Sequence, residues 1–424
     1  MRSVKQDNPA YSLRRPPEGL PRLRACTLLF LVAFVLRLGI GFATRRSADL
    51  YDNEMHRAAR SLAANGTLGN PYTCPTGPTA HVAPGYAAFL ALAYRYAGRP
   101  EVLIVIATSA VASMTYALLP WLAVNLGLSF PVGFAAGLFG AVLPFLPGME
   151  ARGAWEAAWV AWLFVVALGV TGGYWRQPSL RAAVGVGFVW GVAFLFGPAL
   201  APPFAVIMIW LFVKVKPYRA TTLALVATAI LTTAPWIGRN YVQFGRAFWI
   251  RSNFGLELEL SNNPAALPYV IDNLRPAGSF DLHPGRPKAC ALLQRVGELP
   301  YMDEQLHRAL QWIRSNPGGF LRLTGRRVWY FWASPFSSLY RRILALLMGA
   351  LGIVGAVLAI RRAPGGIVGP VLLGTLATFP ALYYFIQADP RYRAPIEPVV
   401  LLAAAYALMP VGRPRDRRAL EAAV

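Results

Sequence analysis

Three acidic residues stand close together just after the first long apolar run of the chain: Asp49, Asp52 and Glu54. A carboxylate in such a place can take a proton from a hydroxyl group, which is the role of a general base. Asp52 and Glu54 would point to different faces of a helix, so we expect one of them to act as base. The alternative is structural, because acids are favoured at the N-terminus of a helix.

A second set of polar residues lies outside the apolar runs and is dominated by arginine. Arginines in short outer loops of membrane proteins are disfavoured, so their presence needs a reason. A guanidinium group binds two phosphate oxygens at once, which favours a phosphate as that reason. Side chains that reach only toward lipid headgroups are the alternative. The candidates for phosphate or substrate binding are Arg57, Arg239, Asn240, Arg251, Arg391, Tyr392 and Arg393.

Two other polar residues, His81 and Arg37, stand apart from these two sets. His81 is a candidate to bind an acceptor or a phosphate, although a lone histidine is more often structural. Arg37 lies inside the first apolar run, where a charge is costly, so we expect it to reach toward the same groove as the acids. Three arginines deeper in the long outer segment are interpreted as structural: Arg246, Arg286 and Arg295.

The two sets together describe one kind of chemistry. A carboxylate would activate an acceptor hydroxyl, and arginines would stabilise the negative charge that grows on a leaving phosphate. That combination suggests transfer of a sugar from a polyprenyl-phosphate carrier.

Composition places these residues on a membrane protein. The chain has 424 residues, of which 56% are hydrophobic and 14% are charged, and the apolar residues come in long blocks. Blocks of about 20 apolar residues match the thickness of a bilayer, and we expect an all-α polytopic protein with about ten transmembrane helices. The net charge of +22 is interpreted through the basic loops of membrane proteins, and no nucleic-acid partner is expected.

Basic clusters predict the orientation of the chain. By the positive-inside rule both termini are cytoplasmic, and residues 44–83 form a first outer loop. We expect an N-terminal membrane module over 1–237, an outer domain over 238–339, and C-terminal membrane helices with a basic tail over 340–424. Of three apolar runs, at about 84–98, 101–124 and 131–147, one is expected to be short, re-entrant or interfacial.

Two outer segments show helical spacing. From Glu54 onward the apolar residues Met55, Ala59 and Leu62 form a narrow stripe, which predicts an amphipathic helix on the membrane surface. The domain over 238–339 is expected to be small and mainly helical. Cys74 and Cys290 fall in these two outer segments, where a disulfide between them is chemically permitted.

Four stretches, in the same order along the chain, carry a resemblance to the GT-C glycosyltransferases. Their closest likeness is to the bacterial branch of the protein mannosyltransferase and aminoarabinose transferase group, which is glycosyltransferase family 39-like. The stretches are NEMHRAARSLAANGTLGNPY with PTGPTAHVAPGYAAFLA, APWIGRNYVQFGRAFWIRSNFGLEL, GELPYMDEQLHRALQWIRSNPGGFLRLTGRRVWYFW and DPRYRAPIEP.

The resemblance implies an inverting enzyme of the cytoplasmic membrane with its active site on the outer, periplasmic face. It implies that the acid of the first loop is the catalytic base, for which we favour Glu54 over Asp52, with Asp49 third. A second acid commonly lies in the next outer loop, where Glu150 and Glu156 stand, although Glu156 could equally cap a helix. Few acids are present there, so no cofactor and no obligatory metal are expected, although some relatives need a divalent ion. The acceptor, whether lipid, envelope glycan or protein, is left open, as is the sugar.

Two other functions remain as alternatives. A transporter or flippase of lipid-linked sugar would place ionisable residues at the midplane of the membrane, whereas most charges here stand at the ends of apolar runs. A non-catalytic member of the same fold would show no turnover.

Overall fold

The computed structural model describes residues 19–44, 52–143, 150, 153–214, 219–274, 279–333 and 338–409. In these ranges the regular structure is helical, and extended pairing is limited to two isolated bridges, Gly69 with Pro78 and Tyr269 with Ala388. The all-helical architecture expected from the composition is confirmed.

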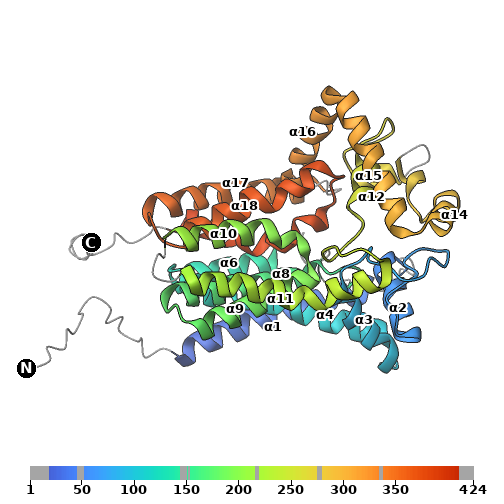
Figure 1. Ribbon diagram of the computed structural model, residues 1–424. Coiled ribbons are helices and arrows are strands. Elements are labelled where there is room, and N and C mark those ends of the chain that lie inside the picture. The colour runs from blue at the N-terminus through green and yellow to red at the C-terminus, as the bar shows by residue number, and fades with distance from the viewer. Residues whose placement is uncertain are drawn as a thin grey trace, which may run out of the picture.

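A bundle of long apolar helices forms most of the molecule (Figure 1). Within the described ranges, six segments are long and apolar enough to cross a membrane: Leu20–Thr44 in α1 (Gly19–Thr44), Pro100–Asn125, α8 (Ala157–Arg176), α11 (Arg219–Phe244), α17 (Leu339–Arg362) and α18 (Val368–Phe385). Pro100–Asn125 contains α4 (Pro100–Ala117) and α5 (Leu119–Asn125). Three shorter apolar segments are α6 (Phe130–Val142), α9 (Leu180–Phe196) and Pro198–Lys214, which contains α10 (Ala201–Lys214).

Small residues allow the bundle helices to approach closely. α9 packs along α11, and α17 packs along α19 (Glu397–Leu408). A Cβ atom at Gly355 of α17 would clash with the backbone carbonyl of Ala403 in α19. Close contact at small residues is typical of helices in a membrane, where apolar surface alone gives little drive for association.

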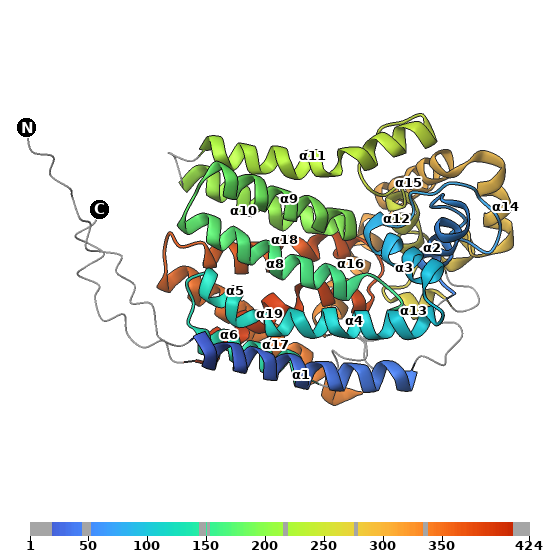
Figure 2. The ribbon, with the colours of Figure 1, turned by 90° about the horizontal axis from the view of Figure 1, so that it is seen from below.

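The remaining helices gather at one end of the bundle (Figures 1 and 2). From the segment between α1 and α4 come α2 (Glu54–Asn65) and α3 (Pro84–Tyr96), which pack against each other. From the long segment after α11 come α12 (Phe254–Ser261), α13 (Val270–Asn273), α14 (Pro287–Val296), α15 (Glu298–Ser315) and α16 (Pro317–Ala333). We call this second group the loop domain. α11 continues past Gly238 to Phe244, so a boundary at 238 falls inside that helix.

The helix predicted from Glu54 onward is confirmed. Asn53 caps it, because its side chain accepts a hydrogen bond from the backbone N–H of His56 at 3.1 Å. The buried face contains Met55, Ala58 and Ala59, which pack in a common core with α3. Of the three apolar runs between 84 and 147, the first forms the short helix α3, which lies beside α2 (Figure 2).

Candidate functional site

Glu54 is the first residue of α2, where the cap by Asn53 fixes the start of the helix. Its side chain is 18% exposed, and its Oε1 atom lies 3.6 Å from Nε2 of His283 in the loop domain. The N-terminus of a helix favours a negative charge, so the fold suits an ionised carboxylate here. Glu54 is therefore a partly exposed carboxylate where α2 meets the loop domain.

Asp52 has a different environment. Its carboxylate accepts hydrogen bonds from Arg57 at 2.9 and 2.7 Å and from Arg60 at 3.0 Å, and its side chain is 57% exposed. The hydrogen bond from Arg57 lowers the pKa of Asp52 below its ordinary value. A carboxylate held in this way is a weak proton acceptor, and the guanidinium of Arg57 is directed to Asp52. Asp49 lies outside the described residues.

His283 was not among the residues singled out from the sequence. Its ring stacks on Phe280 with the centroids 4.3 Å apart, and Nδ1 accepts a hydrogen bond from the backbone N–H of Gly285 at 2.9 Å. The rings of Tyr72 and His81 contact it edge to face. A histidine shortly before Cys290 was the available signal, but its partner Glu54 is too distant in sequence for spacing to reveal.

His81 is buried, and it joins the same group through its ring and its backbone. The hydroxyl of Tyr72 lies 3.0 Å from its Nδ1 atom, and its carbonyl oxygen accepts a hydrogen bond from Nε of Arg251 at 2.9 Å. Burial lowers the pKa of both His81 and His283. Both imidazoles are therefore neutral near pH 7.

Arg251 links His81 to the start of α8 in the bundle. Its Nη1 atom lies 3.7 Å from Oε1 of Glu156, directly before α8. Glu156 makes no side-chain cap hydrogen bond, and its Oε2 atom is buried without a hydrogen-bond partner. Glu156 thus stands at the N-terminus of α8, where an acid is favoured, without capping the helix through a side-chain hydrogen bond.

Arg391 lies beside the same segment. Its guanidinium lies over the ring of Trp155, 3.9 Å from the centroid, and its Nε atom is 3.6 Å from Asp389. It belongs to the short helix η6 (Pro390–Tyr392), which Asp389 caps. We call the whole set the rim site: Glu54, Tyr72, His81, Glu156, Arg251, His283 and Arg391.

Several long-range contacts hold the segment between α2 and α3 against the loop domain. Cys74 and Cys290 form a disulfide, with their Cα atoms 6.4 Å apart, so the permitted pairing is confirmed. The buried carboxylate of Glu298 accepts hydrogen bonds from Thr79, from the backbone N–H of Ala80 and from Ser252. Gln294 donates to the carbonyl of Pro75 at 2.7 Å. These contacts fix the segments that carry His81 and Arg251.

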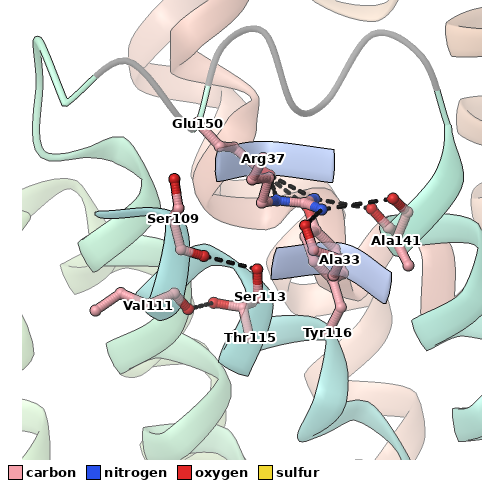
Figure 3. A network of polar contacts seen from close by, with 10 residues as sticks. Ala33, Arg37, Ser109, Val111, Ser113, Thr115, Tyr116, Ala141 and Glu150 are labelled. Carbon is pink, nitrogen blue, oxygen red and sulfur yellow. Dashed lines mark hydrogen bonds and ion pairs between the residues drawn. The ribbon is translucent and has the colours of Figure 1, made fainter. Parts of the chain in front are cut away.

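Glu150 pairs with Arg37 and Tyr116 and not with a residue of the rim site; Figure 3 shows Glu150 beside Arg37. Its carboxylate accepts hydrogen bonds from Arg37 at 2.9 and 2.7 Å and from the hydroxyl of Tyr116 at 2.5 Å. Arg37 also donates to the carbonyl of Gly140 at 2.8 Å, and both charged side chains are buried. Arg37 thus pairs with Glu150 inside the bundle instead of reaching toward the acids of the first loop.

The other predicted binding residues are mostly occupied by protein partners. Arg393 is buried, and its guanidinium donates to Glu397 at 2.6 and 3.1 Å and to the carbonyl of Trp332 at 2.7 Å. Tyr392 stacks on Tyr383.

Two predicted residues near the end of α11 are held by backbone carbonyls, one in the turn that follows the helix and one in the segment before α3. Buried Asn240 donates to the carbonyl of Trp249 at 2.8 Å, and Arg239 donates to the carbonyl of Leu68 at 3.1 Å. Arg239 also lies over the ring of Trp236. Among the described residues, no group of three or more His, Cys, Asp or Glu side chains is placed to hold a metal ion.

Solved structures with a similar fold are oligosaccharyltransferases from Archaeoglobus fulgidus. One, tethered to an acceptor peptide through a disulfide, matches with a TM-score of 0.59 and 14% identity over 92% of this chain and 49% of its own. Another, in complex with an inhibitory peptide and a dolichol-phosphate, matches with a TM-score of 0.57 and 14% identity over 92% of this chain and 50% of its own. The chain thus spans about half the length of the structures it matches.

A third similar structure, of the Archaeoglobus fulgidus enzyme with zinc and sulfate, has a TM-score of 0.56 and 15% identity over 91% of this chain and 48% of its own. No family model matches the sequence, and no curated protein does. The likeness in structure shows the fold: the chain is a polytopic membrane protein with the GT-C fold expected from its sequence.

Proposed function

We propose that this GT-C protein is an inverting glycosyltransferase that uses a lipid-linked phosphate donor. The observation that carries the proposal is Glu54, a partly exposed carboxylate at the N-terminus of α2 that faces the loop domain. Asp52 is the weaker candidate for the base, because its charge is already paired with Arg57 and Arg60.

The reaction follows from the charges at the rim site. Glu54 takes the proton of an acceptor hydroxyl while that oxygen attacks the anomeric carbon of the donor sugar. The bond from this carbon to the phosphate oxygen breaks, and its electron pair leaves with the phosphate. Attack opposite the leaving group inverts the anomeric centre.

The arginines would stabilise the leaving group. A phosphodiester donor carries one negative charge and the released lipid phosphate carries a second, so cationic partners lower the barrier. Arg251 and Arg391 suit this role, because their ion-pair contacts, at 3.7 and 3.6 Å, are long and their side chains are partly exposed. The occupied guanidinium of Arg393 suits a structural role better.

The finer assignments rest on the sequence resemblance. We propose a polyprenyl phosphate as the carrier, a family 39-like enzyme of the bacterial branch, and an acceptor that is a lipid, an envelope glycan or a protein. The dolichol-phosphate and peptide named for the similar structures support a lipid-linked donor in general. We place the rim site outside the cytoplasmic membrane and both termini inside, with the loop domain between two membrane modules.

The test is turnover by the full-length protein in detergent or nanodiscs, with labelled polyprenyl-phosphate sugars and detection of released polyprenyl phosphate. We expect Glu54→Gln to lower turnover by a factor of about 10² to 10⁴, the usual contribution of a general base. Asp52→Asn should keep most of the activity. Glu304→Gln is the matched control, because Glu304 is an exposed acid of the loop domain that pairs with Arg308.

Other outcomes would assign a different catalytic base or a different function. Full activity in Glu54→Gln with loss in Asp52→Asn would move the base to Asp52. If the wild type moves labelled lipid-linked sugar across the membrane without releasing lipid phosphate, the protein is a transporter. If it shows neither activity with any donor, the non-catalytic alternative holds.

A further inference from the structure

The imidazole of His283 is held in one orientation from several sides. Phe280 stacks on one face with an interplanar angle of 11°, and the rings of Tyr72 and His81 contact the histidine edge to face. His283 is 4% exposed. Such close aromatic packing leaves the ring little freedom to turn.

The hydrogen bonds of His283 fix its tautomer. The backbone N–H of Gly285 donates to Nδ1 at 2.9 Å, so Nδ1 is an acceptor and carries no proton. In a neutral imidazole the proton then resides on Nε2. Nε2 is the atom that lies 3.6 Å from Oε1 of Glu54. A donor N–H therefore faces the carboxylate from just beyond hydrogen-bond distance.

The charges around the ring are consistent with a neutral imidazole. Glu54 and Glu257 favour its protonation, whereas Arg286 and Arg57 oppose it, and burial lowers the pKa of His283 more than any of these charges changes it. The remaining titratable neighbours, Tyr72 and His81, are themselves buried. His283 therefore acts near pH 7 as a hydrogen-bond donor and not as a second cation.

We propose that His283 is a positioning residue for Glu54, which it orients through its Nε2–H group from the loop domain. The inference rests on the glycosyltransferase function proposed above. Hydrogen bonds at active sites are often long without substrate and tighten in the complex. As the contact shortens, Nε2–H binds Oε1 and leaves Oε2 free for the acceptor hydroxyl. The proton of the acceptor passes to Glu54, and His283 keeps its own proton.

The test compares two substitutions at one position in the full-length protein. His283→Phe keeps an aromatic ring that can stack on Phe280 but removes the donor. His283→Gln places an amide N–H near the position of Nε2. We expect His283→Phe to lower kcat about tenfold to a hundredfold with little change in the KM of the donor, as for other residues that orient a reactive group. His283→Gln should stay within about threefold of the wild type.

The pH profile separates orientation from mere packing. Loss of the donor removes a hydrogen bond that would favour the charged carboxylate, so the acid limb of kcat/KM in His283→Phe should move to higher pH. His283→Gln should keep the position of that limb. His307→Phe is the matched control, because His307 is an exposed histidine of α15.

The outcomes are distinct from those that test the function itself. Turnover by the wild type and its loss in Glu54→Gln establish the reaction first. If His283→Phe then keeps the kcat and pH profile of the wild type, the proposal is wrong. The proposal is also wrong if His283→Gln loses as much kcat as His283→Phe and shows the same acid limb of kcat/KM. Only the packing of the ring would then matter.

Discussion

Two sets of charged residues in this molecule differ in how fully they are paired. Inside the bundle, Arg37 with Glu150 and Arg393 with Glu397 are at most 3% exposed, with shortest contacts of 2.7 and 2.6 Å. At the rim site, Glu54 lies 3.6 Å from the buried ring of His283, and Arg251 lies 3.7 Å from Glu156. The charged side chains of Glu54, Arg251 and Glu156 are 18 to 24% exposed.

The difference follows from the cost of burying charge. A buried charge is tolerated where a partner and further hydrogen bonds satisfy it, and Arg37 shows this through its contacts with Glu150, Gly140 and Tyr116. A charge at the rim keeps part of its hydration and can exchange water for a ligand. The same residue types thus serve structure in one region and are available for binding in the other.

The largest expected effect is on the stability of the buried pair. Arg37→Met leaves the carboxylate of Glu150 in the bundle without its cation, and loss of one partner of a buried pair costs about 3–5 kcal/mol. Thermal unfolding in detergent measures the effect. Arg37→Met with Glu150→Gln should recover much of the stability, because no unpaired charge remains. If Arg37→Met alone were as stable as the wild type, the buried pair would not be structural. The contrast between the bundle and the rim site would then be wrong.

The neighbours Arg391 and Arg393 sharpen the comparison within a single turn. Arg393→Met should destabilise the protein by about 3–5 kcal/mol, because it leaves the buried carboxylate of Glu397 without its cation. Arg391→Met should lower kcat/KM about a hundredfold with a change in stability below about 1 kcal/mol. Unfolding and turnover are measured on both variants. Equal losses of stability would show that Arg391 is also structural.

The disulfide tests how firmly the rim site is held together. Replacing Cys74 and Cys290 by serine should cost about 2–4 kcal/mol of stability and raise cleavage of the loop domain in limited proteolysis. Cys26→Ser is the control, because Cys26 is a free cysteine. Unchanged protease resistance would mean that Glu298 and Gln294 suffice to hold the two segments.

The smallest expected effect concerns Asp52. Its pKa is lower in the folded chain than in the unfolded chain, so its ion pair adds stability above the ordinary pKa near 3.8 and loses it as pH falls through the lowered value. Because Asp52 is exposed, the contribution is below about 1 kcal/mol. Unfolding of wild type and Asp52→Asn between about pH 7 and pH 2 should show a small difference that vanishes at the acid end. A difference independent of pH would contradict this account.

Local pattern was enough for much of the fold. The apolar blocks and the stripe from Glu54 depend on neighbours in sequence, and both gave the expected helices. The preference for Glu54 over Asp52 rests on the resemblance, and the pairing of Asp52 with Arg57 and Arg60 supports it.

Apart from the disulfide between Cys74 and Cys290, the sequence did not reveal the long-range pairs. Arg37 meets Glu150 across 113 positions and Glu298 meets Thr79 across 219, and no spacing rule joins residues so far apart. The sequence therefore makes Glu150 one of two candidates for a second acid, beside Glu156, and gives no reason to select His283. Both points depend on which charges tertiary packing brings together.

The disulfide between Cys74 and Cys290 has a consequence for how the chain threads the membrane. Two thiols can be oxidised to one bond only when they face the same compartment, so the chain between them must cross the bilayer an even number of times. Within the described part of this interval stand three long apolar segments, Pro100–Asn125, Ala157–Arg176 and Arg219–Phe244, and three shorter ones, Phe130–Val142, Leu180–Phe196 and Pro198–Lys214. If all six cross, the requirement is met; if a single short one failed to cross, the two cysteines would lie on opposite sides. The disulfide therefore limits how many of the short helices can cross the membrane, in addition to joining the segments that carry Cys74 and Cys290.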